Sequence, residues 1–266
     1  MIPEVPISNK PPRVTLVGAG PGDPELITVK GINAIKSADV ILYDALVSGQ
    51  ILELIPEGVP ALSVGKRAGS HAFTQEEINE LIVEFAYLYG HVVRLKGGDS
   101  FVFGRGAEEI EFAEAHGVCA RVIPGISSAI AVPASVNIPV TARGVSESFW
   151  VVTGTTKAGE VSADVSLAAQ SSATVVILMG LKKIREIMGL FEAHGKGETP
   201  VAVIQNGTLP TQRNVLGTVA TISGLTIEEH LGPPAIIVIG EVVRFSEKLK
   251  EIAGEVAGQY QYNGTQ

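Results

Sequence analysis

The sequence has a single cysteine, Cys119, among its 266 residues, so no disulfide can form within one chain. A chain without disulfides is typical of a reducing compartment, and we expect a cytoplasmic protein. Cys119 lies in the short apolar stretch 117–120. We therefore expect a buried packing thiol on a strand rather than a nucleophile, because nothing near it in the sequence would activate it.

Long apolar runs and a basic surplus are also missing. No stretch approaches the roughly 18–20 uninterrupted apolar residues that a membrane-spanning helix needs. The chain has 20 Lys and Arg against 28 Asp and Glu, a net charge of −8. Nucleic acids recruit basic surfaces, so this balance disfavours them as partners. We expect a partner that is neither a membrane nor a nucleic acid.

Several catalytic signatures are absent as well. No Gly-Lys-Ser/Thr follows a glycine turn, which excludes a P-loop, and no Gly-x-Ser-x-Gly elbow anchors a hydrolase triad. The five histidines lie far apart, without the spacing of metal ligands. We expect no metal site.

The chain has two glycine-rich loops instead. Residues 14–18 predict a strand that runs into the turn Gly18-Ala19-Gly20-Pro21-Gly22, after which Asp23 is expected to open a helix. A second loop, KGGDSFVFGRG at 96–106, follows a strand at 91–95. Glycines let the backbone approach a ligand, and free N–H groups at a helix start bind polar groups. We expect the two loops to face one cleft.

A nicotinamide-dependent dehydrogenase is one alternative. Gly18 and Gly20 begin a G-x-G-x-x-G pattern, and Asp44 lies near the position of a ribose-binding acid. However, Asp23 stands where the third glycine should be, and Pro21 removes one phosphate-binding N–H. A second alternative is a ligand-binding module without catalysis.

The order of apolar segments predicts two α/β domains. Short buried strands alternate with helices through the first half, which favours a mostly parallel sheet. Thr74 and Glu77 form a capping-box pattern at the start of one helix. Helices are scarcer in the second half, which favours a mixed sheet; residues 215–222 fit either a strand or a helix edge. The expected divisions are a flexible arm at 1–12, domains at 13–140 and 141–253, and a flexible tail at 254–266.

Longer motifs carry a family resemblance. In the first half they are VGAGPGDPELIT, ADVILYDALVS, VGKRAG followed by TQEEIN, VRLKGGDSFVFGRGAEE and VIPGISSA, and in the second half VTGT, ILMG, QNGT and GPPAIIVIGEVV. In these motifs the chain resembles the tetrapyrrole (corrin/porphyrin) methyltransferase family. The resemblance covers most of the first half and is weaker in the second.

The resemblance implies that S-adenosylmethionine binds in a cleft between the two α/β domains and leaves as S-adenosylhomocysteine. Asp99 could accept hydrogen bonds from its polar groups, and Met179 is a soft apolar wall suited to adenine. The implied cofactor-binding residues are Pro21, Gly97, Gly98, Asp99, Val102, Ser127, Ser128, Met179, Gly207 and Ala235.

The resemblance also implies the reaction. Asp44 and Lys66 match family positions proposed as base and acid, while Arg67 and Arg105 are candidates to pair with substrate carboxylates. The implied reaction is two successive methyl transfers to ring carbons of uroporphyrinogen III, giving precorrin-2, by a homodimer. The alternatives within the family are a methyltransferase of a later corrin intermediate and one that modifies ribosomal RNA or a protein, of which the negative net charge disfavours RNA.

Overall fold

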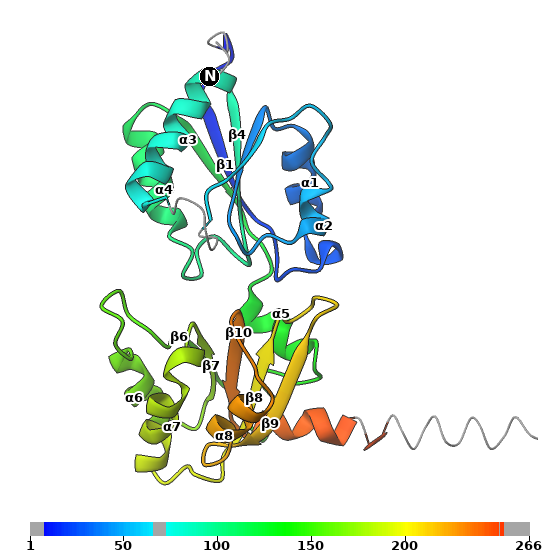
Figure 1. Cartoon of the computed structure of the whole chain (residues 1–266), viewed down its shortest axis with the longest axis vertical. Coiled ribbons are helices and arrows are strands. Elements are labelled where there is room, and N and C mark those ends of the chain that lie inside the picture. Colours follow the sequence, from blue (N-terminus) through cyan, green and yellow to red (C-terminus); the bar gives the residue numbers. More distant parts are fainter. Residues whose placement is uncertain (1–7, 66–72, 250, 253–266) are drawn as a thin grey trace, which may run out of the picture. The chain divides into compact units, whose positions relative to one another are not determined.

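The computed structural model describes residues 8–65, 73–249 and 251–252. The chain divides into two compact units, Met1–Ser128 and Ala129–Gln266, each with its own sheet (Figure 1). The division falls earlier in the chain than residue 141, where we expected the second domain to begin. Val132, Val136 and Ile138 are buried in a core cluster of the second unit, which explains the earlier division.

The first unit is built on a five-stranded sheet of order β3-β2-β4-β1-β5, in which every pair is parallel. The predicted parallel sheet is thus confirmed. Its elements are β1 (Arg13–Gly18), η1 (Pro24–Leu26), α1 (Val29–Lys36), β2 (Val40–Tyr43), α2 (Gly49–Leu52), β3 (Ala61–Ser63), α3 (Gln75–Tyr89), β4 (His91–Lys96), α4 (Gly106–Ala115) and β5 (Cys119–Ile123).

Helices cover both faces of this sheet, as Figure 1 shows. Val17 of β1 packs in the cluster that α1 and α2 complete, whereas its neighbour Leu16 packs in the cluster of α3 and α4. Successive strand residues point to opposite faces, so a central strand buried on both sides reads as a continuous apolar run. The capping box of α3 forms as predicted, since Thr74 Oγ1 accepts from Glu77 N and Glu77 Oε2 accepts from Thr74 N.

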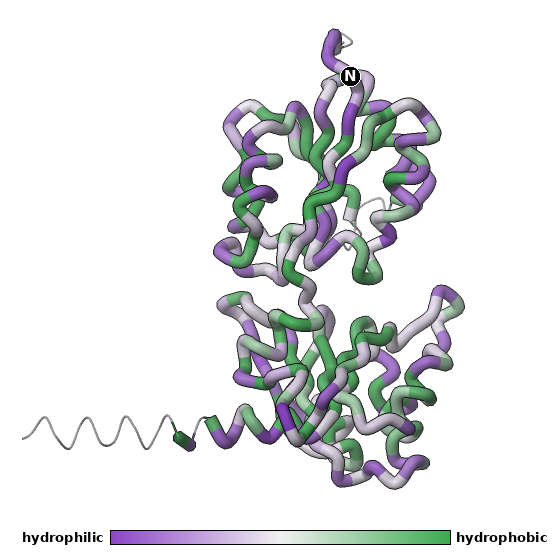
Figure 2. Tube along the Cα trace, turned by 180° about the vertical axis from the view of Figure 1, so that it is seen from behind, coloured by the Kyte–Doolittle hydropathy of each residue, from purple (hydrophilic) through white to green (hydrophobic). Residues whose placement is uncertain are grey.

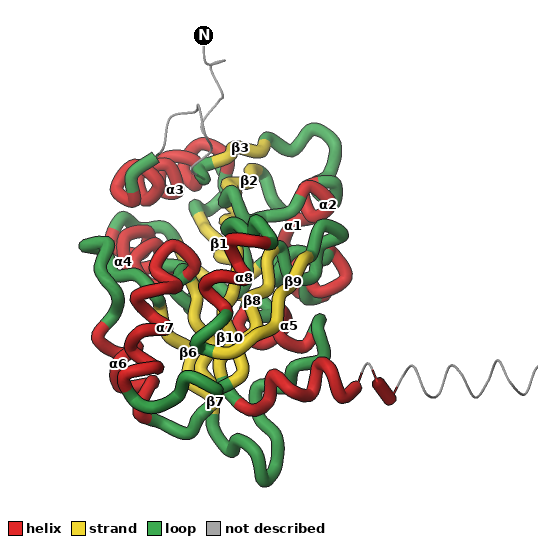
Figure 3. Tube along the Cα trace, turned by 60° about the horizontal axis from the view of Figure 1, so that its bottom comes forward, coloured by secondary structure: helices red, strands yellow, loops and turns green. Residues whose placement is uncertain are grey.

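The second unit holds a mixed sheet of order β6-β7-β10-β8-β9, as predicted. Only β6 and β7 are parallel; the other three pairs are antiparallel. Helices α6 to α8 pack on one face and α5 on the other (Figure 3). Its elements are α5 (Ser128–Ala134), β6 (Phe149–Thr153), α6 (Ala163–Gln170), β7 (Thr174–Leu178), η2 (Leu181–Lys183), α7 (Ile184–Ala193), β8 (Pro200–Gln205), β9 (Arg213–Thr218), α8 (Ile222–Glu228), β10 (Ala235–Ile239) and η3 (Glu241–Val243).

In Figure 2 hydrophobic and hydrophilic residues alternate along the helices, as expected of helices with one buried face. Among the described residues, no helix combines the length and apolar character that crossing a bilayer requires. Residues 8–12 of the expected arm are bonded to the first unit: Ser8 N donates to Leu88 O, and Lys10 pairs with Asp39. The expected tail at 254–266 lies outside the described residues.

Two local expectations were wrong. Asp23 caps only the short η1, and the α-helix begins at Val29, where the Thr28 hydroxyl accepts from Gly31 N at 3.0 Å. Extended backbone at Ile27 and Thr28 separates the two elements. Cys119 is exposed rather than buried, because β5 is an edge strand of the sheet.

Three loops at the carboxyl edge of the first sheet meet through their glycines. They follow the neighbouring strands β4, β1 and β5. A side-chain carbon added at Gly125 would lie 2.3 Å from Gly98 O and 2.6 Å from Gly18 O, closer than such carbons approach other atoms. We call Gly18, Gly98 and Gly125 the glycine junction. Any side chain at Gly18 or Gly125 would force these loops apart.

The glycine junction predicts that Gly125→Ala destabilises the first unit by about 1–3 kcal/mol or more, because the new methyl group overpacks a backbone contact. Gly49 in the same unit has open space around it, so Gly49→Ala is the matched control. We expect the control to change stability by less than about 1 kcal/mol. Urea unfolding compares the two, and equal effects would contradict the steric argument.

Candidate active site

The two glycine loops are bonded to each other. Gly20 N donates to Gly98 O at 3.1 Å, and Gly98 N donates to Gly20 O at 2.7 Å. Ala19 N also donates to Lys96 O. The N–H groups of Gly20 and Gly98 are used in this bridge and are therefore not donors for a ligand. The bridge holds the two loops in a fixed register.

Asp99 ties the same loops to a third one. Its Oδ1 accepts from Phe101 N at 2.8 Å, and its Oδ2 accepts from Gly125 N at 2.9 Å. Ionised carboxylate oxygens have further lone pairs, so Asp99 keeps capacity for a ligand while it organises the loops.

The candidate cofactor residues of the first unit follow three adjacent strands. Pro21 follows β1, Gly97 and Val102 follow β4, and Ser127 and Ser128 follow β5. Val102 is 36% exposed, while the others are half-buried. Because carboxyl ends of parallel strands share one edge, the structure gathers these residues at a single side of the first sheet.

Asp44 follows β2 at the same edge and is held by cations of β4. Arg94 Nη2 donates to Asp44 Oδ1 at 2.5 Å, and Lys96 Nζ lies 3.9 Å from Asp44 Oδ2. Both cations also reach Glu109 of α4: Lys96 Nζ donates to Glu109 Oε1 at 2.8 Å, and Arg94 contributes two longer bonds. We call Asp44, Arg94, Lys96 and Glu109 the charge cluster.

Burial sets the electrostatics of the charge cluster. Glu109 is completely buried, and Arg94 and Lys96 are nearly so, whereas the Asp44 side chain is 29% exposed. Two cations face two carboxylates, which satisfies the requirement that buried charges be paired. Burial lowers the pKa of Lys96, Arg94 lowers it further, and Glu109 and Asp44 oppose the shift. Glu109 Oε2 is buried without a hydrogen-bond partner in the described part of the chain.

Sequence reasoning missed Arg94, Lys96 and Glu109 as parts of this site. A signal was available in HVVRLK, since two cations at alternate positions interrupt a strand that otherwise reads as fully buried. Glu109 carried no such signal, because its role depends on how α4 packs over the sheet.

Of the other candidates in the first unit, Arg105 is already paired. Its guanidinium donates to both carboxylate oxygens of Glu108, at 2.9 and 2.5 Å, on the exposed surface. Any role in substrate binding would require this pair to open or to bind as a unit. Lys66 and Arg67 lie outside the described residues.

The candidates of the second unit also share one sheet edge. Met179 follows β7, Gly207 follows β8, and Ala235 begins the antiparallel β10 that lies between those strands. Met179 is 55% exposed and has φ 56°, a left-handed conformation that is uncommon outside glycine and often marks functional sites.

Gly207 has a packing reason to be glycine. A side-chain carbon there would lie 2.3 Å from Val132 Cγ1 on α5. Its neighbours Asn206 and Thr208 have φ of 51° and 69°. For a β-branched residue such as Thr208 this is a strained backbone, held in place by the surrounding fold.

A model of the family of tetrapyrrole (corrin/porphyrin) methylases matches residues 13–223. The chain belongs to this family. A uroporphyrinogen-III C-methyltransferase of Methanocaldococcus jannaschii is 49% identical to it over 87% of this chain and 96% of that protein. A siroheme synthase of Thiobacillus denitrificans is 42% identical over 95% of this chain, which spans about half (53%) of that longer protein.

Solved structures agree with the family assignment. A uroporphyrin-III C-methyl transferase of Thermus thermophilus, crystallised with S-adenyl homocysteine, has a TM-score of 0.76 and 38% identity, over 87% of this chain and 99% of that one. A cobalt precorrin-4 methyltransferase has a TM-score of 0.78 and 26% identity, over 87% of this chain and 95% of that one.

The charge cluster predicts that Glu109→Gln destabilises the protein by about 3–5 kcal/mol, because two buried cations would then share only Asp44. Glu108→Gln, one residue earlier, removes an exposed carboxylate that pairs with Arg105 and is the matched control. We expect it to change stability by about 0.2–1 kcal/mol. Urea unfolding measures both, and a loss below 1 kcal/mol at Glu109 would contradict the pairing argument.

Proposed function

We propose that this protein transfers methyl groups from S-adenosylmethionine to ring carbons of uroporphyrinogen III, in two rounds that give precorrin-2. The observation that carries the proposal is the 49% identity to a protein named uroporphyrinogen-III C-methyltransferase, which spans 87% of this chain. The geometry supports it, because Asp44 is the one charged member of the charge cluster with substantial exposure.

The candidate cofactor residues fit a sulfonium nucleoside. S-adenosylmethionine supplies an activated methyl group, so the protein needs mainly to bind and align its two substrates. Gly97 and Gly98 present bare backbone, and Asp99 can accept hydrogen bonds from amino or hydroxyl groups. Ser127 and Ser128 follow on the neighbouring loop. In the second unit, the exposed Met179 offers an adaptable apolar wall, with Gly207 and Ala235 beside it on the same sheet edge.

Asp44 is the candidate that acts on the reacting ring. Methylation at carbon leaves a cationic pyrrole that must lose a proton, and a carboxylate can stabilise that charge and take the proton. Arg94 holds the Asp44 carboxylate in one orientation, and the exposed part of the side chain faces solvent. Lys66 would donate a proton where the conjugation rearranges, and Arg67 and Arg105 would bind substrate carboxylates.

Two further properties follow from the family resemblance. We propose that the protein works as a homodimer in the cytoplasm. Light scattering on the purified chain tests the oligomeric state, and a monomer at working concentration would refute the dimer. The alternative substrate is a later corrin intermediate, which the fold likeness to a cobalt precorrin-4 methyltransferase keeps in view.

Anaerobic incubation with S-adenosylmethionine and uroporphyrinogen III should give products heavier by one and then two methyl groups, read by mass spectrometry. An unmodified substrate, with S-adenosylhomocysteine still bound in a calorimetric titration, would move the substrate to a later corrinoid. Loss of cofactor binding as well would reject the proposed activity.

Asp44→Asn should lower kcat by about 10²–10⁴-fold, the usual contribution of a positioned acid or base. The affinity for S-adenosylhomocysteine should be unchanged, because Asp44 lies beside the ring rather than the cofactor in this proposal. Asp164→Asn, at an exposed acid in the first turn of α6, is the control and should leave both quantities unchanged. Full activity in Asp44→Asn would remove Asp44 from the mechanism.

A further inference from the structure

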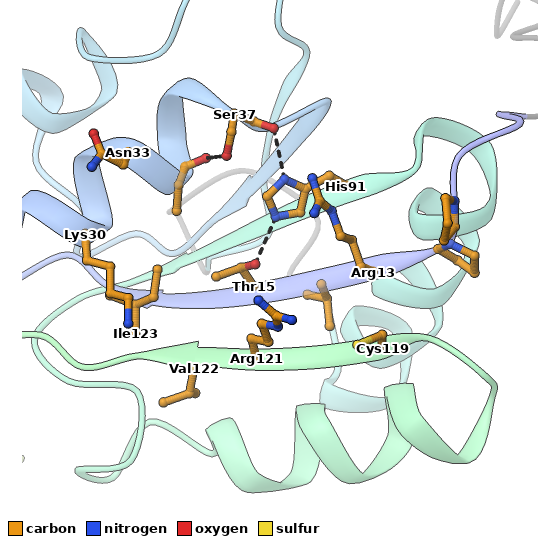
Figure 4. Close-up of a pocket in the computed structure, with 14 residues that line it drawn as sticks. Arg13, Thr15, Lys30, Asn33, Ser37, His91, Cys119, Arg121, Val122 and Ile123 are labelled. Atoms are coloured by element: carbon orange, nitrogen blue, oxygen red, sulfur yellow. Dashed lines mark hydrogen bonds between the residues drawn. The ribbon is translucent and has the colours of Figure 1, made fainter.

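A second cavity of about 430 Å³ lies in the first unit, along the edge strand β5. It is lined by the first residues of β4 and β1, by β5 from Cys119 to Ile123, and by one side of α1 (Figure 4). This volume is within the range of small-molecule sites. None of the described candidate residues for methyl transfer lines it.

Three cations surround the cavity: Arg13 on β1, Arg121 on β5 and Lys30 on α1. Arg13 pairs in register with Cys119, and Thr15 pairs with Arg121, so the two arginines project from the same face of the sheet. Among the residues that the structure describes, no Asp or Glu lines the cavity. Within the described part of the chain, none of the three cationic side chains has a hydrogen bond or ion pair.

The polar floor of the cavity adds no compensating negative charge. His91 Nδ1 lies 2.9 Å from the carbonyl oxygen of Ser37, and His91 Nε2 lies 2.9 Å from Thr15 Oγ1. A carbonyl only accepts, so Nδ1 carries the proton and the Thr15 hydroxyl donates to Nε2. The nearby carboxylate of Asp39 does not line the cavity, and it already accepts from Lys10 and from His91 N.

Unpaired surface cations are common, and solvation alone accounts for most of them. The arrangement here differs because three cations line one cavity in a chain of net charge −8, with Lys30 beside Ile123 and Arg13 beside His91 (Figure 4). Some surface cations elsewhere have glutamate partners, as at Lys183, Arg213 and Arg244. Guanidinium forks match the oxygens of phosphates and carboxylates, and two of them with an ammonium suit a multiply charged anion.

We propose that this cavity is a binding site for a small, multiply charged anion, whose phosphate or carboxylate oxygens are held by Arg13, Arg121 and Lys30. Within the described ranges, the His91 ring is the one aromatic side chain that lines it. The ligand is therefore a compact anion rather than a nucleotide that needs a stacked base. The proposed site does not depend on methyl transfer, and its test is separate from the test of that activity.

Cys119 lines the cavity, is exposed, and is the sole cysteine of the chain, so it reports on the site directly. The test follows alkylation of Cys119 by the neutral reagent iodoacetamide, with mass spectrometry, in the full-length protein. Pyrophosphate and citrate are the phosphate and carboxylate probes, and sodium chloride at matched ionic strength is the reference. Calorimetry with the same two anions measures binding that leaves the thiol accessible.

We expect at least one anion to bind saturably and slow alkylation. The double variant Arg13→Gln/Arg121→Gln should need about tenfold more of it, because two charge-assisted hydrogen bonds are lost. Lys30→Gln, on the exposed surface of α1, is also expected to weaken binding. This single variant tests the site if the double variant does not fold. Arg185→Gln, at an exposed cation of the second unit, is the control and should match the wild type.

The relative effect of the two probes identifies the chemistry, and either preference supports the site. The proposal is overturned if neither anion gives binding heat or protection. It is also overturned if the folded Arg13, Arg121 or Lys30 variants bind as the wild type does, or if Arg185→Gln weakens binding equally.

Discussion

The cost of burying charge governs the first unit. Arg94 and Lys96 occupy the central strand β4, where water cannot solvate them, so a buried carboxylate must stand opposite. Glu109 meets both cations from α4, and Arg94 then extends to Asp44 at the sheet edge. The orientation of the exposed carboxylate therefore depends on a helix that does not touch it. Packing of α4 and the chemistry at the edge are linked through one arginine.

Backbone contacts shape the rest of that edge. The glycine junction and the bridge between Gly20 and Gly98 bring three loops together without side chains, and Asp99 fastens them through backbone amides. The loops thus form a rigid frame on which Val102 and the serines are displayed. In the second unit the left-handed residue Met179 shows the same principle, since its backbone is held in an unfavourable conformation by the surrounding fold.

The fold class was predictable because apolar periodicity and capping are local signals, and the parallel and mixed sheets follow from them. The site was only partly predictable. Asp44 and the glycine loops stood out as motifs, whereas Glu109 became visible only when α4 was placed over β4. The bridge between Gly20 and Gly98 was not predictable for a similar reason, since the two residues are 78 positions apart and their pairing depends on topology. Cys119 was mistaken because a sequence does not state which strand forms the edge.

The two cations and two carboxylates of the charge cluster balance one another, and this neutrality constrains which substitutions the sequence can tolerate. Replacing Glu109 alone leaves a surplus of buried positive charge, and replacing Lys96 alone leaves a surplus of carboxylate, so each single change is unfavourable while the double change restores neutrality. Residues 96 and 109 should therefore covary among homologous sequences, with strong epistasis between them. Asp44 should vary less freely than either, because it is the proposed base and its partner Arg94 is shared with Glu109.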